Sequence, residues 1–176
     1  MCYPVSSMGG HVSVVPNHQL NRKTPLHTRA NVAYFGTFGY ELDLNKLSDE
    51  EISEVKQQIT FMKEYRELIQ FGTFYRLKSP FEGNETVWMT VSEDKKTALV
   101  FWYRERNVVN ADFTRVRLQG LDPDLIYRNE YNETENYGDE LMNLGLLTTD
   151  CTAGEPTSED EPCTDYESRI YVLTAK

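Results

Sequence analysis

The chain has 176 residues, of which 39% are hydrophobic and 26% are charged, a composition typical of globular rather than disordered or fibrous proteins. Its 18 Lys and Arg residues against 28 Asp and Glu residues give a net charge of -10, which disfavours binding to nucleic acid or to anionic membranes. No stretch approaches the roughly 18 consecutive apolar residues of a membrane-spanning helix, and the N-terminus has no secretory-signal pattern. We therefore expect a cytoplasmic protein with no nucleic-acid or membrane partner.

The histidines and cysteines form no metal-binding motif. Residues 1–40 contain no Asp or Glu but all three histidines, which either contribute to a polar site or, as we favour, are ordinary partly buried imidazoles. The cysteines are widely spaced, with no Cys-x-x-Cys pair; the last two could bridge a loop, but we expect free thiols in a reducing compartment. We therefore expect neither a metal nor a cofactor. The residues concerned are His11, His18, His27, Cys2, Cys151 and Cys163.

Residues 1–72 alternate predicted strands and helices. A buried strand is predicted over 8–15, and a helix follows it over 26–35, with Pro25 at its first position and Gly36 ending it. A second strand is predicted over 38–44. Because helices connect the strands, the strands should be parallel.

The clearest helix is predicted over 48–71. Apolar residues recur there at spacings of three and four. Ser48 as N-cap, with Glu51 three residues later, forms a capping box. Gly72 provides the stop.

After Gly72 the pattern changes to short strands separated by turns, which predicts an antiparallel β-sandwich. The best hairpin spans 86–104, with Val87, Met89 and Val91 on one face. An acidic stretch over 130–139 is expected to form a turn, and the polar segment 150–165 a loop. The predicted strands are 73–78, 86–92, 97–104, 114–119, 125–128 and 169–174.

Four aromatic residues of the predicted hairpin have two interpretations. Side chains of this kind form sugar-stacking platforms in binding modules, but in an alternating strand pair they more often pack in a core. We favour packing. The residues are Trp88, Phe101, Trp102 and Tyr103.

Several motifs, in order along nearly the whole chain, resemble the C-terminal part of glycoside hydrolase family 36 α-galactosidases. They are Met-Gly-Gly-His-Val-Ser-Val-Val-Pro-Asn-His-Gln at 8–19, Thr28-Arg29, Phe-Gly-Thr-Phe-Gly-Tyr-Glu-Leu-Asp-Leu at 35–44, Phe-Gly-Thr-Phe-Tyr-Arg-Leu at 71–77 and Gly-Asp-Glu-Leu-Met-Asn-Leu-Gly-Leu at 138–146. The resemblance implies an α+β fold. Residues 1–72 would be the last two βα units of a (β/α)8 barrel, left incomplete, and residues 73–176 an antiparallel β-sandwich.

The resemblance also implies the chemistry. Family members hydrolyse terminal α-galactosides such as melibiose and raffinose with retention, using two carboxyl groups about 5 Å apart. In the family both are Asp residues upstream of the segment that begins at Met8, so we expect no catalytic residue here and no activity of this chain alone. Glu41 and Asp43 match no catalytic motif of the family, and we assign them a structural or rim role. The sugar partners would belong to the longer enzyme, of which this chain is expected to be a C-terminal portion.

Four polar residues on or after the first strand are candidates for the rim of the sugar pocket, since barrel sites form at the carboxyl ends of the strands. They are His11, Ser13, Asn17 and His18. They either line the pocket or only brace the barrel rim.

An alternative function is a β-sandwich module that binds carbohydrate or assembles with other proteins on its own. An incomplete barrel would also expose apolar faces and open strand edges. We therefore expect self-association or pairing with the missing part of the barrel.

Overall fold

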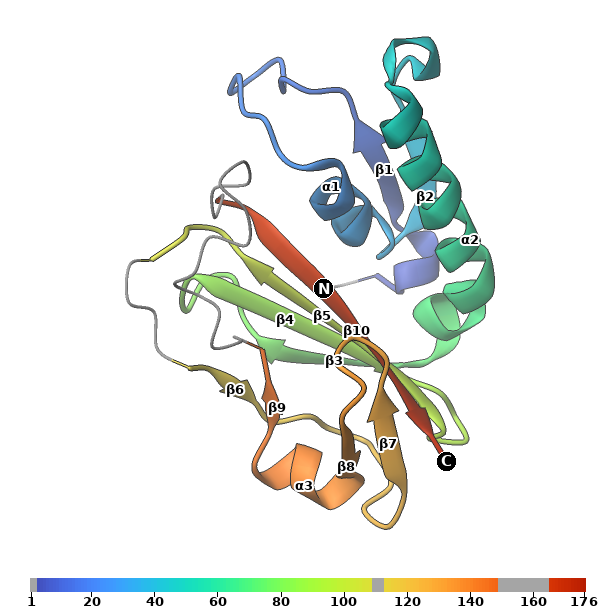
Figure 1. Ribbon diagram of the computed structural model, residues 1–176, viewed down its shortest axis with the longest axis vertical. Coiled ribbons are helices and arrows are strands. Elements are labelled where there is room, and N and C mark those ends of the chain that lie inside the picture. Colours follow the sequence, from blue (N-terminus) through green and yellow to red (C-terminus); the bar gives the residue numbers. More distant parts are fainter. Residues whose placement is uncertain (1–2, 109–112, 149–164) are drawn as a thin grey trace. The chain divides into compact units, whose positions relative to one another are not determined.

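The computed structural model describes residues 3–108, 113–148 and 165–176, in two compact units, Met1–Gly72 and Thr73–Lys176 (Figure 1). All three cysteines, and nearly all of the loop predicted over 150–165, lie outside the described residues. No helix in the described part of the chain has the length and apolar character needed to cross a membrane.

The first unit alternates strands and helices as predicted. Strands β1 (Gly9–Ser13) and β2 (Thr37–Glu41) pair in parallel, with helix α1 (Leu26–Ala33) between them in sequence and helix α2 (Asp49–Phe71) after them. Both strands are shorter than predicted. The chain beyond β2 instead enters a 3-10 turn, Leu44–Lys46, and another 3-10 turn, Val5–Ser7, precedes β1.

Gly10 allows the end of α1 to lie close against β1, and Gly36 allows the connection from α1 to β2 to pass close to the start of β1. A Cβ atom on Gly10 would lie 2.4 Å from the carbonyl oxygen of Ala33, and one on Gly36 would lie 2.7 Å from that of Met8. The helix ends at Ala33, two residues before the predicted end. Pro25 is its N-cap rather than its first helical residue, because the backbone at Pro25 is still extended, with ψ of 148°.

Helix α2 begins as the sequence predicts. The Ser48 hydroxyl accepts from the Glu51 amide at 3.2 Å, and the Glu51 carboxylate accepts from the Ser48 amide at 2.9 Å. Gly72 caps the far end, donating to the Leu68 carbonyl at 2.9 Å. Its backbone is extended there, with φ of -66° and ψ of 165°, so the stop does not use the left-handed conformations that glycine permits.

The second unit is an antiparallel six-stranded sheet with a thinner layer over one face. The layer contains a two-stranded sheet and one short helix. The large sheet has the spatial order β3 (Thr73–Lys78), β4 (Glu85–Val91), β5 (Thr97–Arg104), β10 (Glu167–Ala175), β7 (Ile126–Asn129), β8 (Glu135–Tyr137); the layer has β6 (Arg115–Val116), β9 (Leu146–Leu147) and α3 (Gly138–Asn143).

Part of this layout was not predicted. Strand β6 has only two residues where 114–119 was expected, and β8 lies in the acidic stretch that was expected to form a turn. The pairing of β8 with β7, which places Tyr127 opposite Asn136, explains the strand. Strand β9 and helix α3 were not predicted either.

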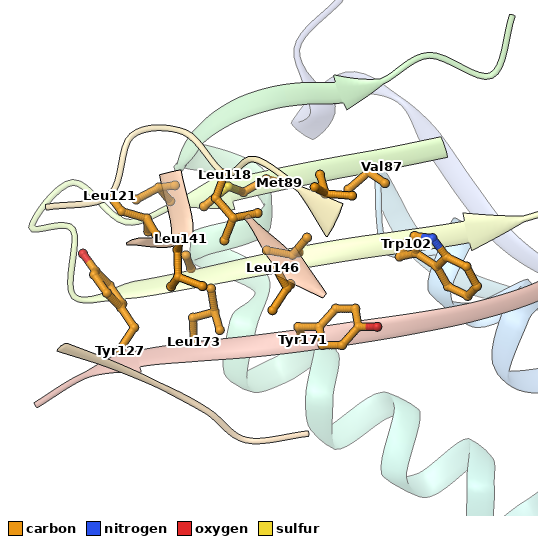
Figure 2. Close-up of a cluster of buried hydrophobic side chains, with 14 residues drawn as sticks. Val87, Met89, Trp102, Leu118, Leu121, Tyr127, Leu141, Leu146, Tyr171 and Leu173 are labelled. Atoms are coloured by element: carbon orange, nitrogen blue, oxygen red, sulfur yellow. The ribbon is translucent and has the colours of Figure 1, made fainter. Parts of the chain in front are cut away.

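The hydrophobic core of the second unit lies between the large sheet and the layer (Figure 2). The predicted hairpin face is confirmed, since Val87 pairs with Trp102 and Met89 with Val100. Apolar side chains from the layer and from the segment after β6 face this sheet, and all of them are buried. They are Leu118, Leu121, Leu141 and Leu146.

The aromatic residues of the hairpin pack rather than form a platform. Phe101 and Trp102 are 0% and 1% exposed, and as sequence neighbours in a strand they point to opposite faces of the sheet. Trp88 and Tyr103 contact each other edge to face, with ring centroids 5.4 Å apart. The four rings therefore cannot present one surface to a sugar.

Candidate functional site

The β1–β2 pair has one apolar face and one polar face. Val12, 0% exposed, and Gly10 face the helices, as does Tyr40, whose hydroxyl donates to the Gln58 side-chain oxygen on α2 at 2.8 Å. Because side chains alternate along a strand, the intervening residues form the other face. These are Gly9, His11, Ser13, Thr37, Gly39 and Glu41.

The polar face carries one contact between a histidine and a carboxylate. The Nε2 atom of His11 lies 2.8 Å from a carboxylate oxygen of Glu41, and the two side chains are 53% and 74% exposed. The parallel register places His11 beside Gly39 and Ser13 beside Glu41. The pair therefore crosses the two strands diagonally near their carboxyl ends.

Arg29 braces the carboxyl end of β1. Its guanidinium donates to the Ser13 carbonyl, and its Nε donates to the Thr24 carbonyl at 3.1 Å. Burial lowers the pKa of Arg29, and the charges of Glu51 and Glu54 oppose that shift. Arg29 was not predicted as a site residue, although the Thr28-Arg29 motif contains it.

Asn17 and His18 have different environments. The Asn17 side-chain oxygen accepts from the Gln19 and Leu20 amides at 3.0 and 3.1 Å, so Asn17 shapes the turn after β1. His18 lies exposed on that turn. Asn17 thus has a structural role whether or not it also meets a ligand.

The structure brings three of the four predicted rim residues together. His11, Ser13 and Asn17 line one cavity of about 230 Å³ at the carboxyl end of β1, which Arg29 also lines, and His18 is not among its lining residues. Glu41 could not be identified from the sequence as the partner of His11, because that contact depends on the strand register.

Among the described carboxyl groups, those with a shifted pKa are all shifted downward: hydrogen bonds from Asn45, Ser48 and Ser92 lower the pKa values of Asp43, Glu50 and Asp94 respectively. The general acid of retaining glycoside hydrolysis needs the opposite shift. Glu41 is paired with His11. Among the described residues, no group of three or more His, Cys, Asp or Glu side chains is placed to hold a metal ion.

The two parts of the sequence match two parts of one enzyme family. Residues 1–72 match the Melibiase family, and residues 85–173 match the Glycosyl hydrolase family 36 C-terminal domain. The chain belongs to glycoside hydrolase family 36. The resemblance of its motifs to that family is thereby confirmed.

Curated relatives of this family 36 chain are α-galactosidases. AgaA of Geobacillus stearothermophilus is 51% identical over 146 residues, which is 83% of this chain and 20% of AgaA. The bifunctional α-galactosidase/sucrose kinase AgaSK of Mediterraneibacter gnavus is 46% identical over 144 residues, which is 82% of this chain and 15% of AgaSK. The chain thus spans a fifth or less of the length of these two proteins.

Solved family 36 structures have the same fold. The crystal structure of AgaA matches 99% of this chain with a TM-score of 0.88 and 45% identity, over 23% of its own chain. The α-galactosidase of Lactobacillus brevis gives a TM-score of 0.90 and 42% identity, over 99% of this chain and 23% of its own. AgaA variants have been crystallised with raffinose and with stachyose.

Proposed function

We propose that this family 36 chain supplies the last two βα units of a (β/α)8 catalytic barrel, residues 1–72, and the C-terminal sandwich, residues 73–176, of a retaining α-galactosidase. The observation that carries the proposal is the β1–β2 pair. Its strands are parallel and in register, and its two faces are unlike, one packed against helices and the other polar. Strands of a (β/α)8 barrel have this arrangement, with helices outside and the site at their carboxyl ends.

In this proposal the chemistry belongs to residues upstream of this chain. The two Asp residues of the family would provide the nucleophile and the acid, and the isolated chain would be inactive. His11 and Ser13 would lie at the rim of the sugar pocket, with Arg29 and Asn17 holding the loop beside it. Substrates would be terminal α-galactosides of the raffinose type, used in cytoplasmic carbohydrate catabolism.

A chimera tests this function. Residues 1–176 would replace the matching C-terminal portion of AgaA, and the purified chimera would be assayed with raffinose and an aryl α-galactoside. We expect turnover by the chimera and none by the isolated chain. A chimera that has the circular dichroism and size of AgaA but no activity would overturn the proposal, as would turnover by the homogeneous isolated chain.

The alternative, a sandwich that binds sugar alone, is tested by calorimetric titration of the isolated chain with galactose and melibiose. The burial of Phe101 and Trp102 removes the stacking surface that such a module would need. We therefore expect no binding heat. Saturable binding with a stoichiometry of about one would favour the module.

Pairing with the missing part of the barrel also follows from the proposal. A cavity of about 520 Å³ lies between β2 and α2, lined in part by Phe38, Ile59 and Met62. Val14 and Val32 are about half exposed elsewhere in the same unit. We expect the isolated chain to self-associate, and light scattering that finds only monomer at high concentration would contradict this.

A further inference from the structure

The residues around His11 on the polar face of β1–β2 are small. Apart from His11 and Glu41, which pair with each other, the other four of the six residues on this face are Gly, Ser or Thr. A Cβ atom added to Gly9 or to Gly39 would meet nothing within 4 Å, in contrast to Gly10 on the other face. Gly39 is the register partner of His11, so its neighbour on β2 has no side chain to cover the imidazole.

The pairing with Glu41 determines how a neutral His11 uses its two nitrogens. An ionised carboxylate only accepts hydrogen bonds, so Nε2, at 2.8 Å from the Glu41 oxygen, carries the hydrogen. The other nitrogen, Nδ1, is then an acceptor. The imidazole is about half exposed, and a pair this exposed contributes little to folding stability. His11 also lines the cavity of about 230 Å³ at the carboxyl end of β1, which is where barrel sites form. An acceptor held in one orientation there is suited to a hydroxyl group of a ligand.

We propose that Glu41 is a positioning residue that holds His11 as the Nε2–H tautomer, so that Nδ1 accepts a hydrogen bond from a hydroxyl group of the bound sugar. This inference rests on the proposed function, because the sugar is the substrate of the complete enzyme. Glu41 does not touch the sugar; it acts through His11.

The first experiment examines the pair in the isolated chain and does not depend on activity. Long-range proton–nitrogen correlation spectra of the ¹⁵N-labelled chain at pH 8 report which ring nitrogen of His11 carries hydrogen. We expect the Nε2–H tautomer alone in the native sequence and a mixture of tautomers in Glu41→Ala. The matched control, Asp43→Asn, changes a nearby carboxylate that accepts from the Asn45 amide, and it should leave the spectrum unchanged. An unchanged tautomer ratio in Glu41→Ala would overturn the positioning role.

The second experiment tests the sugar contact in the AgaA chimera. Loss of one hydrogen bond should reduce kcat/KM for raffinose and weaken inhibition by galactose by roughly threefold to tenfold in both His11→Ala and Glu41→Ala. Because Glu41 acts through His11, the double variant should be no worse than His11→Ala alone. His11→Asn, which keeps a polar group near the Nδ1 position, should recover part of the loss.

The outcomes separate the two proposals. Multiplicative losses in the double variant, or native kcat/KM in Glu41→Ala, would overturn the inference while the active chimera upholds the proposed function. A folded but inactive chimera would overturn the proposed function and with it the sugar contact, whereas the tautomer spectra would still decide whether Glu41 positions His11. Far-ultraviolet circular dichroism of each variant should match the parent protein.

Discussion

The two units differ in how completely they bury their strands. In Thr73–Lys176 the central strand β5 buries every residue from Ala98 to Trp102. In Met1–Gly72 the strand β1 buries Val12 alone, and β2 buries none of its residues fully. The second unit therefore contains a core of its own, whereas the first packs only one face of a two-stranded sheet. Two paired strands are marginal without further packing, so secondary structure alone does not make the first unit self-sufficient.

The largest expected effect comes from opening the core of the second unit. Leu173 is 0% exposed within that core, and Leu173→Ala should cost about 2 to 5 kcal/mol of its unfolding free energy. Both tryptophans of the chain, Trp88 and Trp102, lie in this unit, so urea unfolding followed by their fluorescence measures it. Leu144→Ala, at a 55% exposed position, is the control and should cost less than about 0.5 kcal/mol. Equal losses would mean that the core is not where the stability resides.

Hydrogen exchange compares the units within one molecule. Amides in the centre of β5 and β10 should exchange at least about a hundredfold more slowly than those of β1 and β2, because local opening is easier where few apolar contacts are buried. Mass spectrometry of peptides from the exchanged intact chain measures the ratio. Similar protection of the amides in the two sheets would contradict the claim that only the second unit has a core of its own.

A glycine pair sharpens the account of the first unit. Gly10→Ala should cost about 1 to 3 kcal/mol, because the added Cβ would lie 2.4 Å from the Ala33 carbonyl oxygen and backbone would have to move. Gly9→Ala adds the same atom to open space and should cost far less. Circular dichroism at 222 nm, which reports mainly the long helix α2, follows the urea transition. A cost for Gly9→Ala as large as that for Gly10→Ala would contradict the assignment of the two faces.

The smallest expected effect concerns pH. Burial, and then the charge of Glu54, raises the pKa of Tyr40 to about 12, above the value of about 10 in an unfolded chain. The protonated phenol therefore stabilises the fold fully below pH of about 10, and this contribution is lost as the pH rises through about 12. Tyr40→Phe should reduce the loss of stability between pH 9 and 11, as measured by urea unfolding at the two pH values. Tyr137→Phe, at an exposed position, controls for removal of a hydroxyl group; the same pH dependence in Tyr40→Phe as in the native chain would refute the prediction.

The sequence predicted features that depend on local signals and missed those that depend on partners. The capping box of Ser48 and Glu51 and the hairpin of β4 and β5 are confirmed. Both could be predicted because capping and side-chain alternation depend on residues close together in the sequence. Strand β8 was missed because its residues have no strand character of their own and are extended only by pairing with β7. The strand has only three residues, which is too few to show an alternating pattern of apolar and polar side chains.

The candidate site shows the same division. His11 and Ser13 were predicted from their place on a strand, and the structure places both on its polar face. Glu41 and Arg29 acquire their contacts only when the strands align and α1 packs against β1. Asn17 shapes a turn, as expected of an Asn that follows a strand in a polar segment.

The place of β10 in the large sheet has a consequence for synthesis on the ribosome. This strand follows every other strand in the chain, yet it lies in the interior of the sheet, joining β5 on one side to β7 on the other. The hairpins on either side can form as they emerge, but they remain separate sheets with unpaired edges until the last strand has been made. Completion of the sheet is therefore a late, long-range event, and a nascent chain stalled before residue 167 exposes two edges that invite pairing with other chains.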